Sequence, residues 1–257
     1  MAPEEGLSAV GAPQGANAPS GGSAAAQAAR RHRARPLALF DLDGTLLDGD
    51  TDELWCEFLI AEGILDRAGF EARNRDVAER YAEGAITPAE FCAFYASTLA
   101  GRTPAEWAGQ RERFVASVIV PRLGAAARAL VDGHRKAGDR LLLTTATNRF
   151  LTAPIAAFLG FDEGHLIATE LELEGGRFTG RNRGVLNMRE GKVARLQTWL
   201  AEAGVASGAL ADAVFYSDSG NDLPLLRAVG GPVAVDPDAR LRAEAERAGW
   251  SIISLVR

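Results

Sequence analysis

Most features that mark extracellular, membrane and metal-thiolate proteins are scarce or missing in this sequence of 257 residues. Only two cysteines occur, Cys56 and Cys92, and their spacing fits no metal-binding motif. We therefore expect reduced, buried thiols rather than a disulfide framework. No apolar run approaches the roughly 18 residues of a membrane span, and the N-terminal segment has no hydrophobic centre of the secretory kind. These absences predict a cytoplasmic protein without a membrane partner.

An excess of positive charge is also missing. The formal net charge is −6 and the pI is about 5.3, which argues against nucleic acid as a partner of the folded part. Hydrophobic residues make up 47% and charged residues 24% of the chain, as in ordinary globular proteins. The length suits one large domain, or a main domain with an insertion. A small anionic substrate would need a locally positive pocket.

The first 35 residues differ in composition from the rest of the chain. Residues 1–35 are built largely from Ala, Gly, Ser, Pro and Gln, and such a segment cannot bury enough apolar surface to fold. We predict a disordered tail here. Its basic end, residues 30–35, is interpreted as solvated charge, with contact to nucleic acid or a membrane surface as the alternative.

Residues 51–120 carry large apolar side chains at helical spacing. Turn signals at Thr87-Pro88 and Thr103-Pro104 separate the expected helices. The density of aromatic residues predicts that this segment has a small core of its own, formed by ordinary packing and not by a cofactor site.

From Pro121 onward the patterns of strands and helices alternate, which predicts an α/β fold with a doubly wound, mostly parallel sheet. Helices are expected at 122–137, from Phe150, from Glu190, after Asn221 and at 238–248. Strands are expected at Leu37–Phe40, Arg140–Thr145, His165–Thr169, Ala213–Ser217, Pro232–Val235 and 251–255, with a glycine-rich hairpin over Glu170–Arg183. Active sites in such sheets lie beyond the carboxyl ends of the strands.

Two carboxylates follow the first apolar strand directly, in the run F-D-L-D-G-T. Side chains alternate along an extended chain, so Asp41 and Asp43 should leave the backbone toward the same side. Buried carboxylates are costly unless a cation meets them. The sequence therefore predicts a site built on two carboxylates.

Three further polar clusters fall at strand ends or helix starts. Thr145 ends the second strand, Lys192 begins a helix, and Asp218 and Asp222 follow another strand. Taken singly, these residues read as a turn or N-cap, a surface lysine and an Asx turn. Considered together, they indicate a site, because the predicted sheet brings these three clusters and the Asp41–Asp43 pair to one edge.

Four carboxylates at one edge of a sheet would repel each other and raise each other's pKa values unless a cation compensates. Oxygen ligands suit a hard divalent ion, and Mg²⁺ is the prediction. Zinc is disfavoured because the clusters hold no His or Cys. The four residues are Asp41, Asp43, Asp218 and Asp222.

The combination F-D-L-D-G-T, a strand ending in Thr145, Lys192 and S-D-S-G-N-D resembles the four motifs of the haloacid dehalogenase-like hydrolase superfamily. It is most similar to the phosphoserine phosphatase-like branch, which implies a core at 36–50 and 121–257 and an inserted helical cap at 51–120. The run T-A-T-N-R resembles a bacterial subgroup that includes histidinol-phosphate phosphatases. One departure is Thr145-Ala146-Thr147, where the branch usually has Ser-Gly-Gly.

The resemblance implies a role for each matched residue. Asp41 would be the nucleophile and Asp43 the acid–base residue, while Lys192 and Thr145 would neutralise the phosphoryl oxygens. Mg²⁺ would be held by Asp41, the carbonyl of Asp43 and Asp218, with Asp222 in support. The substrate-binding candidates are Gly44, Asp50, Asn148, Arg149 and Asn221. Asp50 is expected either to bind a substrate ammonium group or to act as an N-cap.

The expected function is that of a Mg²⁺-dependent phosphatase. It would hydrolyse a small phosphorylated metabolite, such as phosphoserine or histidinol phosphate, through an aspartyl-phosphate intermediate. Two alternatives stay open: a phosphotransferase on the same fold, and a non-catalytic module that binds phosphate and Mg²⁺. The sequence disfavours a dehalogenase, because that chemistry needs neither Asp43 nor a metal-binding cluster of acidic residues.

Overall fold

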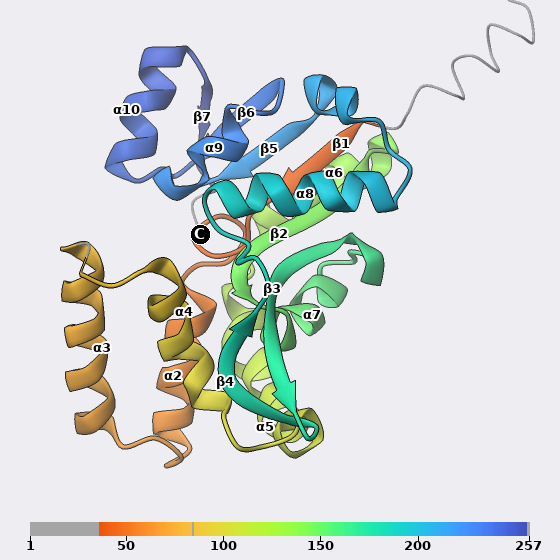
Figure 1. Ribbon diagram of the computed structural model, residues 1–257. Helices are drawn as coiled ribbons and strands as arrows, with labels where there is room; N and C mark the ends of the chain where they lie inside the picture. The colour runs from red at the N-terminus through yellow and green to blue at the C-terminus, as the bar shows by residue number, and fades with distance from the viewer. Residues whose placement is uncertain (1–35, 84, 256–257) are drawn as a thin grey trace, which may run out of the picture. The chain divides into compact units, whose positions relative to one another are not determined.

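A computed structural model describes residues 36–83 and 85–255 of the chain. The predicted disordered tail and its basic end lie outside the described residues. Seven strands form one sheet in the order β4-β3-β2-β1-β5-β6-β7 (Figure 1). Every neighbouring pair is parallel except β3 and β4. The strands are β1 (Leu37–Phe40), β2 (Arg140–Asn148), β3 (Leu166–Glu174), β4 (Arg177–Arg183), β5 (Val214–Ser217), β6 (Gly231–Val235) and β7 (Ser251–Ile253).

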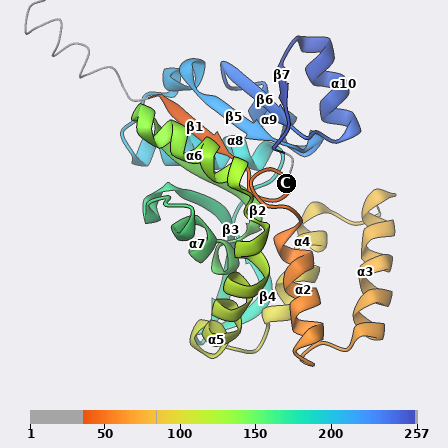
Figure 2. The ribbon, with the colours of Figure 1, turned by 180° about the vertical axis from the view of Figure 1, so that it is seen from behind.

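Helices cover both faces of the sheet, so the predicted α/β, doubly wound fold class is confirmed. Figure 1 shows α8 in front of the central strands, and Figure 2 shows α6 on the opposite face. The helices of this part are α6 (Ala125–Ala137), α7 (Arg149–Phe158), α8 (Glu190–Glu202), α9 (Leu223–Leu226) and α10 (Ala239–Ala248).

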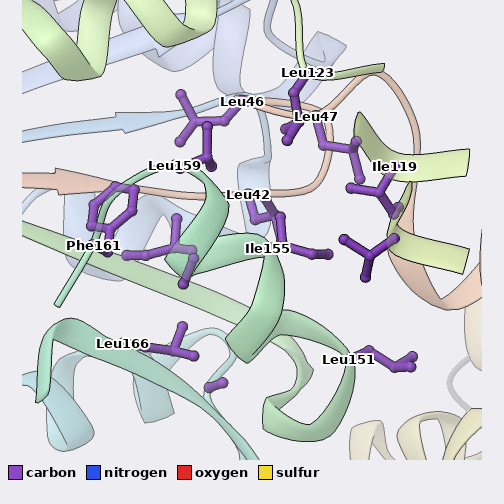
Figure 3. Close-up of a cluster of buried hydrophobic side chains, with 14 of the residues drawn as sticks. Leu42, Leu46, Leu47, Ile119, Leu123, Leu151, Ile155, Leu159, Phe161 and Leu166 are labelled. Carbon is purple, nitrogen blue, oxygen red and sulfur yellow. The ribbon is translucent and has the colours of Figure 1, made fainter. Parts of the chain in front are cut away.

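Strand β1 is buried along its whole length because its two faces pack into two different clusters. Leu37 and Leu39 pack with residues of α8, α9 and α10, whereas Ala38 and Phe40 pack with residues of α6 and α7. The second cluster continues beyond the strand to Leu42, as the close-up in Figure 3 shows. The central position of β1 places its carboxyl end, and the acidic residues after it, in the middle of the sheet edge.

Four helices are inserted between β1 and α6: α2 (Thr51–Ala61), α3 (Arg67–Ala82), α4 (Pro88–Ala96) and α5 (Pro104–Phe114). Thr87 and Thr103 begin α4 and α5 with capping boxes, as the Thr-Pro turn signals predicted. A π-helical turn, Val115–Ile119, and a 3₁₀ turn, Val120–Arg122, connect α5 to α6. The boundaries of the cap at residues 51 and 120 stay a prediction.

The expectation that this insertion has a separate core is only partly met. Trp55, Trp107 and Phe114 belong to the same buried cluster as Phe40 of the sheet. A small separate cluster forms around Cys56, Phe70 and Tyr95. The difference arises because the π-helical turn Val115–Ile119 contacts α2, α5 and α7. The large aromatic side chains of α2 and α5 therefore extend the main core.

The hairpin predicted over Glu170–Arg183 forms, and its ends pair as Glu170 with Arg183. Its second strand reaches the inserted helices: the Phe178 carbonyl accepts from Gly101 N at 2.9 Å, and Phe178 N donates to the Arg102 carbonyl at 2.9 Å. Backbone pairing therefore joins the hairpin to the connection between α4 and α5.

Cys56 and Cys92 are free thiols, as expected; Cys56 is buried, whereas Cys92 is only half-buried. Within the described residues, no single helix is long and apolar enough to cross a membrane. One bent pair of helical segments, Pro104–Arg122 and Ala125–Ala137 at 92°, meets the length and composition test together.

Candidate active site

The loop after β1 is a tight turn that carries the first pair of carboxylates. Asp41 N donates to the Tyr216 carbonyl at 2.9 Å, which continues the pairing of β1 with β5. The Leu42 carbonyl accepts hydrogen bonds from the backbone amides of residues 45–47. Gly44 has a φ of +73°, and a Cβ at this position would clash with the Asp218 carboxylate. A glycine is therefore required both by the turn and by the close approach of Asp218.

Lys192 lies between two carboxylates from different strands. Its Nζ donates to Asp41 Oδ1 at 2.9 Å and to Asp222 Oδ2 at 2.6 Å, and the lysine is only 2% exposed. Burial acts to lower the pKa of Lys192, but the charges of Asp222 and Asp41 outweigh it and raise that pKa above its ordinary value. Ser217 Oγ also donates to Asp222 Oδ2, at 2.8 Å. The ammonium group is thus fixed in position and charged.

The pKa of Asp41 is raised well above its ordinary value, first by burial and then by the nearby charges of Asp222 and Asp218. Lys192 opposes this shift. One ammonium group therefore compensates only part of the negative charge around Asp41.

Asp43 is held by four hydrogen-bond donors. Its Oδ1 accepts from Thr51 N at 2.8 Å and from the Thr51 hydroxyl, and its Oδ2 accepts from Thr147 Oγ1 at 2.9 Å and Thr145 Oγ1 at 3.2 Å. Burial, with the charge of Asp50, raises the pKa of Asp43 to about 6, although the bonds from Thr51 and Thr147 oppose the shift. A carboxyl group with this pKa can both give and take a proton near neutral pH.

Asp218 is tied to the first loop by Thr45. The Thr45 hydroxyl donates to Asp218 Oδ1 at 2.9 Å and accepts from Asp218 N at 3.0 Å. Burial raises the pKa of Asp218 to about 6. The loops after β1 and β5 are thereby joined.

The four carboxylates and Lys192 line a cavity of about 340 Å³. Its other walls come from the first turn of α2, from Phe91, Cys92 and Tyr95 of α4, and from Met188 in the loop before α8. A larger hollow of about 780 Å³ lies at the opposite end of β2, around Arg140 and Trp199. The chemistry-bearing residues belong to the smaller cavity.

Most of the predicted site residues come together. Thr145 lies beneath Asp43 and is fully buried, so its hydroxyl contacts the carboxylate and the side chain does not line the cavity. The predicted residues that do line it are Asp41, Asp43, Gly44, Asp50, Lys192, Asp218, Asn221 and Asp222.

Two predicted substrate contacts lie elsewhere. Asn148 is the N-cap of α7, accepting from Leu151 N at 3.1 Å. Arg149 binds Glu170 Oε1 at 2.7 Å and the Leu166 carbonyl at 2.9 Å. Neither side chain lines the cavity, because β2 continues to Asn148 and turns the following residue toward β3. Asp50, in contrast, combines a place on the cavity wall with the N-cap of α2, since it accepts from Glu53 N at 3.0 Å.

Three further residues of the site were not predicted from the sequence: Thr51, Thr147 and Asp52. Thr147 lies two residues after Thr145, and this spacing was the available signal that both hydroxyls reach the same side. Asp52 also lines the cavity, and its Oδ1 accepts from Asn148 Nδ2 at 3.4 Å. Burial, and then the charges of Asp50 and Asp43, raise the pKa of Asp52 well above its ordinary value.

The site offers oxygen donors that suit a hard cation. Among the described residues, no three His, Cys, Asp or Glu side chains form a ready-made metal group. Asp41 and Asp218 offer two carboxylates whose pKa values are raised mainly by burial, so a nearby cation would stabilise their ionised forms. One oxygen of Asp222, in contrast, is already bound to Lys192 and Ser217. These oxygens fit a Mg²⁺ ion that draws its remaining ligands from a main-chain carbonyl and water.

A family model described as haloacid dehalogenase-like hydrolase matches residues 38–227. A histidinol-phosphatase of Neisseria meningitidis serogroup C is 40% identical over 219 residues, which cover 85% of this chain and 98% of that protein. The phosphoserine phosphatase SerB1 of Mycobacterium tuberculosis is 32% identical over 225 residues, covering 84% of this chain and 69% of that protein.

Solved structures agree with this assignment. A protein of unknown function from Bordetella pertussis Tohama I has 47% sequence identity and a TM-score of 0.82, covering 87% of this chain and all of that one. A phospho-aspartyl intermediate analogue of phosphoserine phosphatase, at 19% identity and a TM-score of 0.63, covers 88% of this chain and 95% of its own and shares the fold. The chain therefore belongs to the haloacid dehalogenase-like hydrolases, in their phosphoserine phosphatase-like branch.

Proposed function

We propose that the chain is a Mg²⁺-dependent phosphatase that hydrolyses a small phosphorylated metabolite through an aspartyl-phosphate intermediate. The names of the relatives, a histidinol-phosphatase and a phosphoserine phosphatase, support this reaction class. The observation that carries the proposal is the placement of Lys192 between Asp41 and Asp222, in a cavity that Asp43 also lines.

Asp41 is the proposed nucleophile. One of its carboxylate oxygens attacks phosphorus in line, the bond from phosphorus to that oxygen forms, and the bond to the leaving alkoxide breaks. Burial works against ionisation of Asp41, and the ammonium group 2.9 Å away keeps the reactive anion available. Lys192 then also neutralises the charge that develops on the transferring phosphoryl oxygens.

Asp43 is the proposed acid–base residue. In the first step it gives its proton to the leaving alkoxide, and in the second it takes a proton from the water that hydrolyses the aspartyl-phosphate. Its pKa of about 6 suits both tasks. The hydroxyls of Thr51, Thr145 and Thr147 orient its carboxyl group, so we assign Thr145 to this positioning and not, as the sequence suggested, to the phosphoryl group.

Asp41, the carbonyl of Asp43 and Asp218 are proposed to hold Mg²⁺, and the bound ion would shield the negative charge of the phosphate from the attacking carboxylate. Asp222 supports the site by positioning Lys192. Gly44, Asp50 and Asn221, which line the cavity, are the proposed substrate contacts. Asn148 and Arg149 act at a distance, by fixing the start of α7.

The test is phosphate release from a panel of small phosphomonoesters with Mg²⁺ present, comparing the wild type with Asp41→Asn. The substitution keeps shape and removes the nucleophile, so turnover should fall to background while circular dichroism stays native. After an acid quench, mass spectrometry of wild-type protein should detect phosphate on the peptide that contains Asp41. Full activity of Asp41→Asn, or full activity in EDTA, would contradict the proposal.

A further inference from the structure

The walls of the cavity are strongly acidic. Among the described residues that line it, seven carry carboxylates and one, Lys192, carries a positive charge. The ammonium group of Lys192 is bound to Asp41 and Asp222. The seven acidic residues are Asp41, Asp43, Asp50, Asp52, Glu53, Asp218 and Asp222.

The acidic residues fall into two groups with different surroundings. Asp41, Asp218 and Asp222 lie at the strand ends with Lys192, where the phosphate and Mg²⁺ are proposed to bind. Asp50, Asp52 and Glu53 lie on the first turn of α2, toward the inserted helices. Their described hydrogen bonds are with the backbone and with the side chains of Asn148 and Thr147, and no described cationic side chain forms an ion pair with them. The second group therefore lines the part of the cavity beyond the proposed phosphate and Mg²⁺ sites.

A basic side chain that is near the cavity but not on its wall is Arg189. Its Nε donates to Asn221 Oδ1 at 3.3 Å, and Arg189 is not among the lining residues. Among the described residues, the wall of the cavity thus carries carboxylates and no guanidinium group.

The wall supplied by α4 is apolar and polarisable. Phe91 and Tyr95 contact each other edge to face with ring centroids 5.5 Å apart, and the Tyr95 hydroxyl is bound to Asn74 Oδ1 at 3.0 Å. Cys92 Sγ lies 3.7 Å from Met188 Sδ. Aromatic faces next to carboxylates bind organic cations well, and they offer a carboxylate no compensating donor.

We infer that this cavity selects phosphate esters of amino alcohols, whose leaving group carries a cation and no carboxylate, over phosphate esters of amino acids. The inference rests on the proposed phosphatase function and narrows its substrate class. A leaving group with an ammonium or imidazolium group would be attracted by Asp50 and Glu53, whereas a carboxylate would face like charges, which is a strong means of rejection. Histidinol phosphate meets this requirement, and phosphoserine does not.

The direct test uses two substrates that differ only in the carboxylate, O-phosphoethanolamine and O-phospho-L-serine, with L-histidinol phosphate as a larger amino-alcohol ester. The kcat/KM for each amino-alcohol ester should exceed that for phosphoserine by at least about tenfold. An equal or higher kcat/KM for phosphoserine would overturn the inference. Asp41-dependent hydrolysis of p-nitrophenyl phosphate, which carries neither charge, tests the proposed function separately.

Variants assign the selectivity to α2. Glu53→Lys should reduce or reverse the ratio of kcat/KM for amino-alcohol esters to kcat/KM for phosphoserine, because it places a cation on the cavity wall where a carboxylate was. The matched control is Glu57→Gln, one turn further along α2, whose carboxylate binds Arg67 at 3.2 Å outside the cavity; it should leave the kcat/KM ratio unchanged. A ratio insensitive to Glu53→Lys, or a phosphoserine activity that depends on Arg189, as judged by Arg189→Gln, would overturn the assignment.

Discussion

Thr45 and Asp218 form a reciprocal pair of hydrogen bonds across 173 positions of the sequence, with the threonine hydroxyl accepting from the Asp218 amide and donating to its carboxylate. The pair joins the loop after β1 to the loop after β5. It therefore sets the distance between the two carboxylates, Asp41 and Asp218, that are proposed to share a metal ion.

Removing this hydroxyl should loosen the site. Thr45→Val leaves the Asp218 amide and carboxylate without their partner, and a loss of about 1–3 kcal/mol in the free energy of unfolding is expected. The concentration of Mg²⁺ needed for half-maximal activity should rise. Urea unfolding and Mg²⁺ titration of activity measure the two effects. Thr198→Val, an exposed threonine on α8, is the control; equal effects of both variants would contradict the role of Thr45.

Lys192 should be needed for folding as well as for activity. Lys192→Met leaves Asp41 and Asp222 buried without a cation, and the free energy of unfolding is expected to fall by about 3–5 kcal/mol. Lowering the pH toward 5 should recover part of the stability, because the unpaired carboxyl groups can then be protonated. Chemical unfolding at several pH values checks this. If the Lys192→Met protein is as stable as the wild type at pH 7, Asp41 and Asp222 do not need the Lys192 ammonium group for folding, which would contradict the prediction.

The raised pKa of Asp43 predicts the direction of a stability change with pH. The pKa of the Asp43 carboxyl group rises from 3.8 to about 6 on folding, so the folded state binds the proton more tightly than the unfolded state. The resulting stability is complete below about 3.8 and is lost as the pH rises through about 6, which amounts to about 3 kcal/mol.

This change is measured as the difference between the wild type and Asp43→Asn in a chelating buffer. Between pH 4 and pH 6.5 the stability of the wild type should fall relative to that of the variant, which cannot titrate at this position. A constant difference across this range would show that Asp43 keeps an ordinary pKa.

Thr147 should tune the acid–base residue. Its hydroxyl donates to Asp43 Oδ2 and favours the ionised form, so Thr147→Val should raise the pKa of Asp43 and move the pH profile of kcat upward. The control is Thr179→Val, whose hydroxyl binds Glu172 away from the cavity. A lower kcat with an unmoved pH profile would indicate that Thr147 has only a packing role.

Much of the site followed from the sequence because the carboxyl ends of parallel strands meet at one edge. Asp41, Lys192, Asp218 and Asp222 were placed together on this rule. The structure joins Lys192 to Asp41 and Asp222 by hydrogen bonds and places all four residues on the wall of one cavity. Their spacing along the chain carries this information once the strand order is known.

The hydroxyls around Asp43 could not be predicted in the same way. Whether Thr51 reaches a carboxylate depends on where the first turn of α2 lies relative to the loop after β1. Whether Thr147 reaches it depends on the irregular pairing of β2 and β3 between Thr145 and Asn148, and a shift of this kind changes the side to which each following residue points. The same irregularity explains why Arg149 lies against Glu170. The shared core of Trp55 and Phe40 was missed because a helical pattern shows which face is apolar but not which element will cover it.

The backbone pairing of Phe178 with Gly101 and Arg102 restricts how the cleft can exchange substrate and product. Swinging the whole insertion away as one rigid lid would break both hydrogen bonds, since the β3–β4 hairpin belongs to the sheet. Movement of α3, which packs mainly on α4, would open the cleft without breaking this pairing, whereas α4 itself packs against β4. Changes in the length of this hairpin would alter the gating of the reaction without touching any group that takes part in it.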